Sequence, residues 1–371
     1  MHKRLYAVLA FVMMASLVLA GCATPTAAPT EAPVVPTTAP VVPTKALPTA
    51  VPLPGEGYIA CQVSDTGGTD DKSFNQFAWV GMERARDELG VDIRFLESKG
   101  DADYEPNLNA FVAEGCSTIF GVGYLLDGAL AKVAPANADV DFGGVDTWSP
   151  DVANYMGSYY NIHEATMLAG YLAAGMTKTG IVGVYAGLNI PPVTAFSDGY
   201  YMGIKAYNDA HGTTVKLEGW DPVAKDGLFT GDFTDTDKGR TMTETLLDAG
   251  ADIIMPVAGP VGAGSLAVFE ERGTGLLIGV DTDWSSFYPD QADFVLASAM
   301  KRMDLFVFDT IKSGVDGTFT GGNYTGTLEN GRVSMDVGSA WISKVPAALM
   351  AEIDALKAKI ISGEVSAAFP R

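Results

Sequence analysis

The chain has 371 residues, 47% of them hydrophobic, with 45 acidic and 24 basic side chains and a formal net charge of −21. An acidic surface of this kind argues against nucleic acid and anionic lipid headgroups as binding partners, because both are polyanions. The apolar fraction excludes general disorder, and a chain of this length usually divides into two folded lobes.

The first 21 residues have the pattern of a lipoprotein signal peptide. A short basic start is followed by the largely apolar run 5–20, which is too short to span a bilayer comfortably and suits a secretory segment. The run ends in Leu19-Ala20-Gly21-Cys22, small residues directly before a cysteine. We expect Cys22 to carry lipid and the protein to be extracytoplasmic and lipid-anchored to the cell membrane. The alternative is an ordinary secretory signal with an incidental cysteine.

Residues 22–56 are predicted to form a Pro/Thr-rich tether. Nine of the 20 prolines lie in 23–55, and the sequence Ala-Pro-Val-Val-Pro-Thr occurs at 32–37 and again at 39–44. Such a stretch cannot bury a core and favours extended polyproline II, which rises about 3.1 Å per residue. We therefore expect a stalk that holds a folded part away from the bilayer.

From residue 57 onward, strand patterns alternate with helix patterns. Strands are expected at 58–64, 92–96, 117–122, 140–145, 181–185, 214–220, 253–257, 276–280 and 295–298. Helices are expected at 74–89, 104–113, 126–133, 163–176, 194–211, 238–249, 262–272, 302–313 and 346–362. This alternation predicts an α/β protein with two doubly wound parallel-sheet lobes.

The loops at the expected carboxyl ends of the strands are rich in Gly, Asp, Asn and aromatic residues. They comprise 65–76, 121–124, 146–148, 231–233, 258–264 and 279–284. In open α/β sheets, ligands bind outside the carboxyl ends of the strands. Any single loop of this composition is more simply an ordinary turn, but six of them in one chain favour a ligand site.

The order of five sequence blocks carries a family resemblance: DTGGTDDKSFNQFAW (65–79), EATMLAGYLAAGMTKTG (164–180), IPPVTAFSDGYYMGIKAYN (190–208), GADIIMPVAGPVGAG (250–264) and IGVDTDW (278–284). The chain resembles the basic membrane protein family of ABC-transporter substrate-binding lipoproteins, which includes purine nucleoside receptors. The resemblance implies a type I periplasmic-binding-protein fold, with three segments crossing between the lobes near Asn161, Asp281 and Gly317. The implied N-terminal lobe is 57–161 plus 283–317, and the C-terminal lobe is 162–282 plus 318–371.

The resemblance also implies a base-binding clamp. Phe74 and Phe233 would stack on the two faces of the base, and such stacking contributes about 1 kcal/mol per ring beyond area burial. Asp65 and Asn75 would face the edge of the base, since a purine offers both donors and acceptors. For each ring taken alone, core filling is the alternative.

Further residues are assigned to the sugar by the same resemblance. Asp281 and Lys301 would bind ribose hydroxyls, and Asp146 and Gly259 would line the same cleft. Asp283 competes with Asp281, because either side chain of that loop could point inward. A solvated surface lysine is the alternative for Lys301.

Two features of the sequence leave alternatives open. Trp284 stands where many relatives have an amide residue, and its ring would either enter the cleft or lie outside it. Cys61 and Cys116 lie near the first and third strands, where an extracellular setting permits a disulfide. The alternative is two buried thiols that behave as small apolar residues.

The sequence does not favour an enzyme. The segment 64–71 is similar to the calcium loop of nucleoside hydrolases, but the first two aspartates of that pattern fall on Ser64 and Thr66. Asp70 and Asp71 are interpreted as helix N-terminal acids. No metal-ligand spacing, nucleophile elbow or phosphate loop is found, so neither a metal, a cofactor nor catalysis is expected.

The sequence therefore predicts a substrate-binding protein of an ABC importer that closes on a nucleoside, most simply a purine nucleoside, by hinge motion. The implied partners are a permease with its ATPase and the membrane, through the lipid on Cys22. A monomer is expected. The alternatives are a ribose-type sugar receptor and a ligand sensor coupled to a signalling partner.

Overall fold

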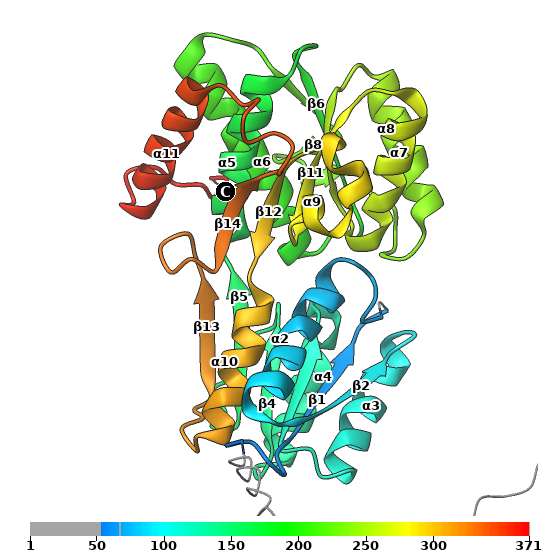
Figure 1. Ribbon diagram of the computed structural model, residues 1–371, viewed down its shortest axis with the longest axis vertical. Helices are drawn as coiled ribbons and strands as arrows, with labels where there is room; N and C mark the ends of the chain where they lie inside the picture. Colours follow the sequence, from blue (N-terminus) through cyan, green and yellow to red (C-terminus); the bar gives the residue numbers. More distant parts are fainter. Residues whose placement is uncertain (1–52, 67, 371) are drawn as a thin grey trace, which may run out of the picture. The chain divides into compact units, whose positions relative to one another are not determined.

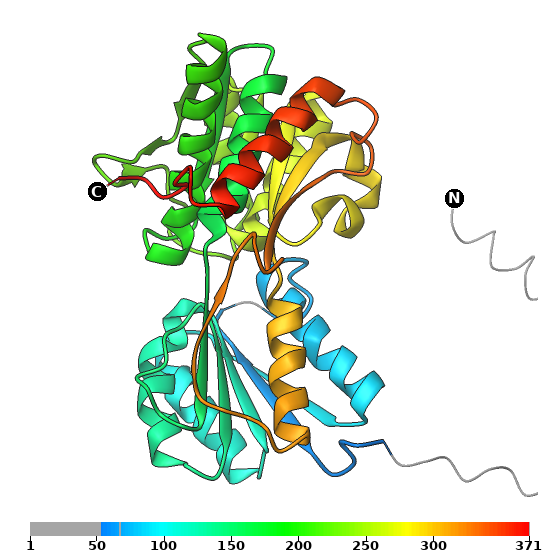
Figure 2. The same cartoon turned by 90° about the vertical axis from the view of Figure 1, so that its left-hand side faces the viewer.

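The computed structural model describes residues 53–66 and 68–370 of the chain. The expected signal peptide, the lipidation site at Cys22 and nearly all of the tether lie outside these residues. Two six-stranded sheets organise the folded part, each covered by helices on both faces (Figures 1 and 2).

The first sheet has the strand order β13-β5-β4-β3-β1-β2, and all its strands are parallel. Its strands are β1 (Ile59–Ser64), β2 (Asp92–Glu97), β3 (Thr118–Val122), β4 (Asp141–Val145), β5 (Tyr155–Tyr160) and β13 (Gly322–Gly326). The central strands β1, β3 and β4 are buried apolar runs, as expected for a parallel sheet with both faces covered.

Four helices cover the first sheet. Helices α2 (Phe74–Leu89) and α10 (Met303–Val315) pack against each other, and α3 (Asp101–Ala113) packs against α4 (Asp127–Ala136), which follows the short helix η1 (Tyr124–Leu126). Helix α2 ends at Gly90, whose φ of 77° is the left-handed conformation that glycine adopts at little cost. Cys61 and Cys116 are joined by a disulfide within the apolar layer beneath α3 and α4.

The second sheet has the order β14-β12-β11-β10-β6-β7, in which only β14 is antiparallel to its neighbour. Its strands are β6 (Ile181–Ala186), β7 (Lys216–Glu218), β10 (Ile253–Val257), β11 (Leu276–Asp281), β12 (Val295–Lys301) and β14 (Val333–Val337). A small hairpin, β8 (Trp220–Asp221) with β9 (Asp226–Gly227), follows β7.

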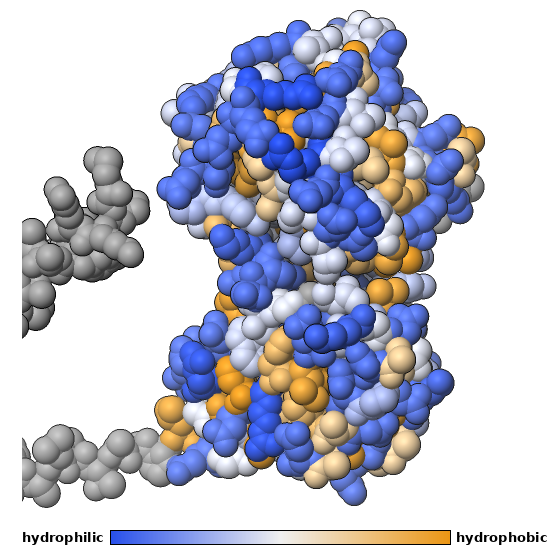
Figure 3. Space-filling view, turned by 90° about the vertical axis from the view of Figure 1, so that its right-hand side faces the viewer, coloured by the Kyte–Doolittle hydropathy of each residue, from blue (hydrophilic) through white to orange (hydrophobic). Residues whose placement is uncertain are grey.

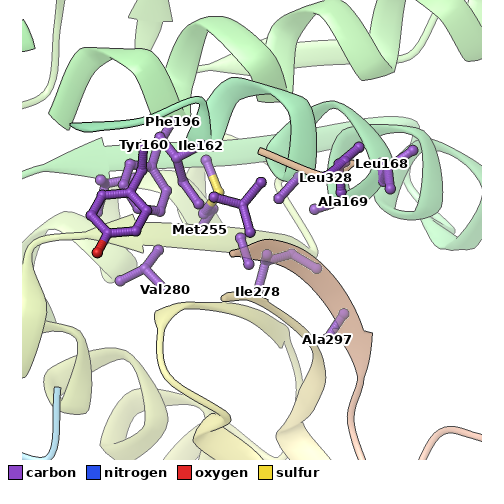
Figure 4. Close-up of a cluster of buried hydrophobic side chains, with 14 of the residues drawn as sticks. Tyr160, Ile162, Leu168, Ala169, Phe196, Met255, Ile278, Val280, Ala297 and Leu328 are labelled. Atoms are coloured by element: carbon purple, nitrogen blue, oxygen red, sulfur yellow. The ribbon is translucent and has the colours of Figure 1, made fainter. Parts of the chain in front are cut away.

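Helices α5 (Ile162–Met176), α6 (Pro191–His211) and α11 (Ala347–Ile361) cover one face of the second sheet. The other face carries α7 (Thr236–Asp248), η2 (Gly259–Gly262), α8 (Ala263–Arg272), α9 (Trp284–Phe287) and η3 (Pro289–Phe294). Under α5 and α6, the core brings Tyr160 beside Phe196 and Ile162, with Met255, Ile278 and Val280 from the strands (Figure 4). Helix α6 begins with two prolines, a position where a missing backbone N–H costs nothing.

Three segments cross between the sheets (Figures 1 and 2). The first lies at Asn161, between β5 and α5, where the family resemblance implies it. The second lies at Arg302, between β12 and α10, and not near Asp281. The third is 327–332, between β13 and β14, and not near Gly317.

Strand pairing therefore corrects two of the expected lobe boundaries. Strand β12 pairs with β11 in the second sheet, although 283–317 was expected in the first lobe. Strand β13 pairs with β5 in the first sheet, although 318–371 was expected in the second lobe. The reason is that 282–294 forms only short helical turns, which return the chain to the neighbouring position of the same sheet.

The two doubly wound lobes are confirmed; the strands that the sequence missed are β5, β13, β14 and the hairpin β8–β9, and it also missed the short helices η1, α9 and η3. Side chains on the face shown in Figure 3 are mostly hydrophilic, with scattered apolar positions. No helix in the described part of the chain is long and apolar enough to cross a membrane.

Candidate ligand-binding site

A cavity lies where the carboxyl ends of strands from both sheets meet. Its empty space, open mouth included, amounts to about 640 Å³. The residues that line it are Asp65, Asp71, Phe74, Asn75, Gly123, Tyr124, Leu125, Asp146, Ile190, Pro192, Val193, Phe196, Phe233, Val257, Gly259, Pro260, Asp281 and Lys301. Strand-to-helix connections of both lobes thus supply the walls, as the loop composition predicts.

Three phenylalanines line the cavity. Phe74 is the first residue of α2, and Phe233 lies in the loop before α7; both rings are half-buried. Phe196, from α6, is almost fully buried. A Cβ atom at Gly187 would lie 2.2 Å from the Phe233 ring, so only glycine at this position leaves room for the ring.

The buried ammonium of Lys301 contacts two carboxylates and lies near two aromatic rings. Its ammonium donates to Asp146 Oδ2 at 2.8 Å and lies 3.7 Å from Asp281 Oδ1. The same nitrogen lies 5.1 Å from the centroid of the Phe196 ring and 5.3 Å from that of Phe74, within cation–π range. Because Asp146 belongs to the first lobe and Lys301 to the second, this buried ion pair spans the two lobes.

Burial and neighbouring opposite charges act on the pKa values of Asp281 and Lys301 in opposite directions. Burial raises the pKa of the Asp281 carboxyl to about 6, against a smaller lowering by the Lys301 ammonium. Burial by itself lowers the pKa of Lys301, but Asp146 and Asp281 together raise it above its ordinary value. Asp281 Oδ1 has no hydrogen-bond partner among the described residues.

Both carboxylates sit on left-handed backbone, with φ of 57° at Asp146 and 66° at Asp281. Each directly follows or ends a buried strand, β4 or β11. Aspartate tolerates this conformation better than most side chains do. The turn directs each carboxylate out of its strand and toward the cavity.

A second polar group surrounds Asn75. Its side-chain nitrogen donates to Asp65 Oδ1 at 3.0 Å and to Asp71 Oδ2 at 3.3 Å, while its Oδ1 is buried without a hydrogen bond. Burial raises the pKa of the Asp71 carboxyl, against the lowering effect of the N–H groups of Gln76, Ser73 and Asn75. This arrangement presents acceptor oxygens to the cavity.

The structure brings together all but one of the residues that the sequence assigned to a ligand: Asp65, Phe74, Asn75, Asp146, Phe233, Gly259, Asp281 and Lys301. Asp283 is the exception and is corrected. Its Oδ1 accepts from the backbone and side chain of Ser285, and its Oδ2 from Ser286, so it caps α9. Of the two alternatives in that loop, Asp281 is the residue that lines the cavity.

Trp284 does not line the cavity. Its side chain is fully buried against Tyr288 at 5.0 Å between ring centroids, and its Nε1 donates to the Val280 carbonyl. Glycines at 262 and 279 make room for the indole, since a Cβ at either would lie 2.6 Å from it. Its role is packing.

Three polar or aromatic cavity residues had no assigned ligand role in the sequence analysis: Asp71, Phe196 and Tyr124, the last named only as part of the loop 121–124. Asp71 was interpreted only as a helix N-terminal acid; it does accept from the backbone at the start of α2, and it lines the cavity as well. Phe196 lies at a helical position whose apolar spacing gives no sign of a ligand role. The apolar wall of Ile190, Pro192 and Val193 lies in a quoted sequence block but was not singled out.

No group of three or more metal-binding side chains occurs among residues 53–66 and 68–370. The cavity is lined by aromatic rings, aliphatic side chains, carboxylates, one amide and one buried ammonium.

The fold and this cleft define a class, the solute-binding proteins of ABC transporters. A solute-binding protein of Aeropyrum pernix K1 superposes with a TM-score of 0.76 at 28% identity, over 83% of this chain and 92% of that one. A second, from Conexibacter woesei, has the same fold, with a TM-score of 0.62 at 23% identity over 84% and 98% of the two chains. These similarities confirm the expected fold.

Residues 59–368 match the Bmp family model, described as ABC transporter substrate-binding protein PnrA-like. The chain belongs to this family. The "ABC transporter nucleoside-binding protein BmpA" of Lactococcus lactis subsp. cremoris is 29% identical over 378 residues, covering 97% of this chain and 99% of that protein. The "CD4+ T-cell-stimulating antigen" of Listeria monocytogenes is 31% identical over 327 residues, covering 83% and 87%. The chain is thus a substrate-binding protein and not an enzyme, as the sequence predicts.

Proposed function

We propose that the protein is a lipid-anchored extracytoplasmic receptor that binds a purine nucleoside and delivers it to an ABC importer. The observation that carries the proposal is the pairing of Phe74 and Phe233, which come from different lobes, in one cavity with the buried Lys301 group. The relative from Lactococcus lactis, named as nucleoside-binding, supports the same ligand class.

The cavity has the chemistry that a nucleoside needs. Half-buried rings offer faces for stacking on a planar base. The Asn75 group offers acceptors and an amide to the edge of the base, and a purine presents several donors and acceptors there. Asp281, Asp146 and Lys301 are charged partners for ribose hydroxyls, and bonds to charged groups are stronger than those between neutral ones.

Binding would act through hinge closure. The lobes are joined at Asn161, Arg302 and 327–332, and each lobe supplies one clamp ring. A ligand that contacts both lobes stabilises the closed form relative to the open form by its differential affinity. The closed form would then dock on the permease.

The cellular setting belongs to the same proposal. Residues 1–21 would be removed as a signal peptide, lipid on Cys22 would hold the protein at the membrane, and 22–56 would keep it near the permease and its ATPase. Three of the similar proteins carry the name lipoprotein, which supports the anchor. We expect a monomer.

Isothermal titration calorimetry of the full-length protein with adenosine, guanosine, inosine, cytidine and ribose tests the ligand class. The purine nucleosides should bind most tightly. Binding of ribose alone would favour the sugar receptor, and heat from none of the five would remove the nucleoside proposal.

Phe233→Ala tests the clamp. Loss of the ring should weaken nucleoside binding at least about tenfold, through lost stacking and lost burial, while circular dichroism stays unchanged. The matched control is Phe95→Ala, which removes a half-buried ring of β2 that packs against Trp79 of α2, outside the cavity. Equal affinities of the two variants would contradict the assignment of Phe233.

A further inference from the structure

Acidic side chains outnumber basic ones in the lining of the cavity. Four carboxyl groups line it, those of Asp65, Asp71, Asp146 and Asp281, and Lys301 is the one basic side chain among its lining residues. All four carboxyl side chains are buried or largely so. Charges inside a low-dielectric cavity act more strongly on a ligand than the same charges at the surface.

The Lys301 ammonium already interacts with two of these carboxylates. Asp146 at 2.8 Å and Asp281 at 3.7 Å both engage its ammonium. A ligand anion would have to compete with two fixed carboxylates for the same cation.

Two other basic side chains, Arg302 and Lys238, also have carboxylate partners. Arg302 forms a two-pronged ion pair with Asp304, at 2.9 and 2.7 Å. Lys238 is bonded to Asp232, the neighbour of Phe233 in sequence. Neither side chain lines the cavity. Lys72, which follows Asp71 in sequence, is exposed, faces the Tyr288 ring at 5.1 Å and does not line the cavity.

Asn75 Oδ1 accepts no hydrogen bond from the described residues, and Asp281 Oδ1 has only the Lys301 ammonium, at 3.7 Å, beyond hydrogen-bond distance. Both residues are more than nine-tenths buried. An acceptor in such a place calls for a donor from the ligand. The phosphate group of a monoester is an anion at neutral pH, and its oxygens almost exclusively accept hydrogen bonds.

We infer that this cleft selects its ligand by charge: it admits neutral or cationic nucleosides and excludes phosphorylated ones. The inference rests on the proposed function and adds a selectivity to it. One consequence concerns supply. Nucleotides must first lose phosphate by hydrolysis, in which water cleaves the phosphate ester to give the nucleoside and inorganic phosphate, and a different protein must catalyse that step.

Four 5′ derivatives of adenosine, and the same four of guanosine, separate charge from size in calorimetry at pH 7. They are the parent nucleoside, the cationic 5′-amino-5′-deoxy compound, the neutral 5′-O-sulfamoyl ester and the anionic 5′-monophosphate. The sulfamoyl ester has nearly the size of the monophosphate without its charge.

We expect the monophosphate to bind at least about 100-fold more weakly than the sulfamoyl ester, and the amine at least as tightly as the parent. Equal weakness of the monophosphate and the sulfamoyl ester would mean exclusion by size and would overturn the inference. Equal affinity of parent and monophosphate would overturn it as well, with the proposed function intact. If neither parent nucleoside binds, the proposed function itself fails.

A variant tests whether the carboxylates are the cause. Asp281→Asn removes one of them, leaves the pair between Lys301 and Asp146, and suits the left-handed backbone. The affinity ratio of sulfamoyl ester to monophosphate should fall at least about tenfold, and any general loss of affinity cancels in this ratio. The control Asp209→Asn removes an exposed acid on α6 and should leave the ratio unchanged. An unchanged ratio in Asp281→Asn would refute the inference.

Discussion

The carboxylate of Asp281 should make the protein less stable at neutral pH. In the folded state its pKa is about 6, raised from 3.8 chiefly by burial. The folded protein therefore binds this proton more tightly than the unfolded chain does. The stability that the neutral carboxyl provides is complete below pH 3.8 and is lost as the pH rises through about 6.

The size of the effect follows from that shift. A difference of about two pH units corresponds to ~3 kcal/mol in the free energy of unfolding. Asp281→Asn removes the ionisation and keeps the shape of the side chain, and Asn also tolerates the φ of 66°. The variant should thus be more stable than the wild type by up to ~3 kcal/mol above pH 6 and equal to it near pH 4.

Urea unfolding at intervals between pH 4 and pH 8, followed by circular dichroism, measures this difference. The control Asp209→Asn, which removes an exposed acid of the same lobe, should follow the wild type. A difference between Asp281→Asn and the wild type that does not change with pH would refute the reasoning. So would a variant that is less stable than the wild type above pH 6.

Three further predictions concern packing and the hinge. Replacing Cys61 and Cys116 by Ser should lower the free energy of unfolding by up to about 4 kcal/mol, for a disulfide with a sequence separation of 55; a melting temperature that does not respond to reductant in the wild type would contradict this. Trp284→Ala should cost about 3–5 kcal/mol in urea unfolding, and an altered ligand affinity without loss of stability would instead mean that the indole reaches the ligand. Glu164 accepts from the Leu328 backbone N–H at 2.8 Å, so Glu164→Ala should speed hydrogen exchange of that amide; unchanged exchange would mean that the bond does not secure the crossing segment.

The two-lobe fold is predictable from the sequence because its central strands are buried runs flanked by amphipathic helices. The elements that were missed carry weaker signals. Strand β13 reads Gly-Asn-Tyr-Thr-Gly, and β14 is an alternating strand of only five residues, Val-Ser-Met-Asp-Val, so neither has an apolar run. The sheets of β12 and β13 were misassigned because the chain crosses twice after residue 301, and the short connections give no sign of which sheet follows.

Site residues were predictable where they lie in loops, or at helix starts, of unusual composition. Phe74, Asn75 and Asp281 lie in loops or at helix starts with conspicuous composition, and all three line the cavity. Phe196 was not predictable, because a phenylalanine at a helical position looks the same whether it faces a core or a cleft. The prediction for Asp283 was wrong for another reason. When a loop holds two aspartates two residues apart, the sequence does not reveal which one caps the following helix.

Lys301 and Arg302 are consecutive residues, the first the last residue of β12 and the second the crossing itself. The ammonium that contacts both lobes is therefore one peptide bond away from a segment that crosses between them. If the lobes close as proposed, a backbone rotation at this crossing would change the separation of Lys301 from Asp146 directly. Residues 301 and 302 would accordingly couple ligand binding in the cleft to the angle between the lobes.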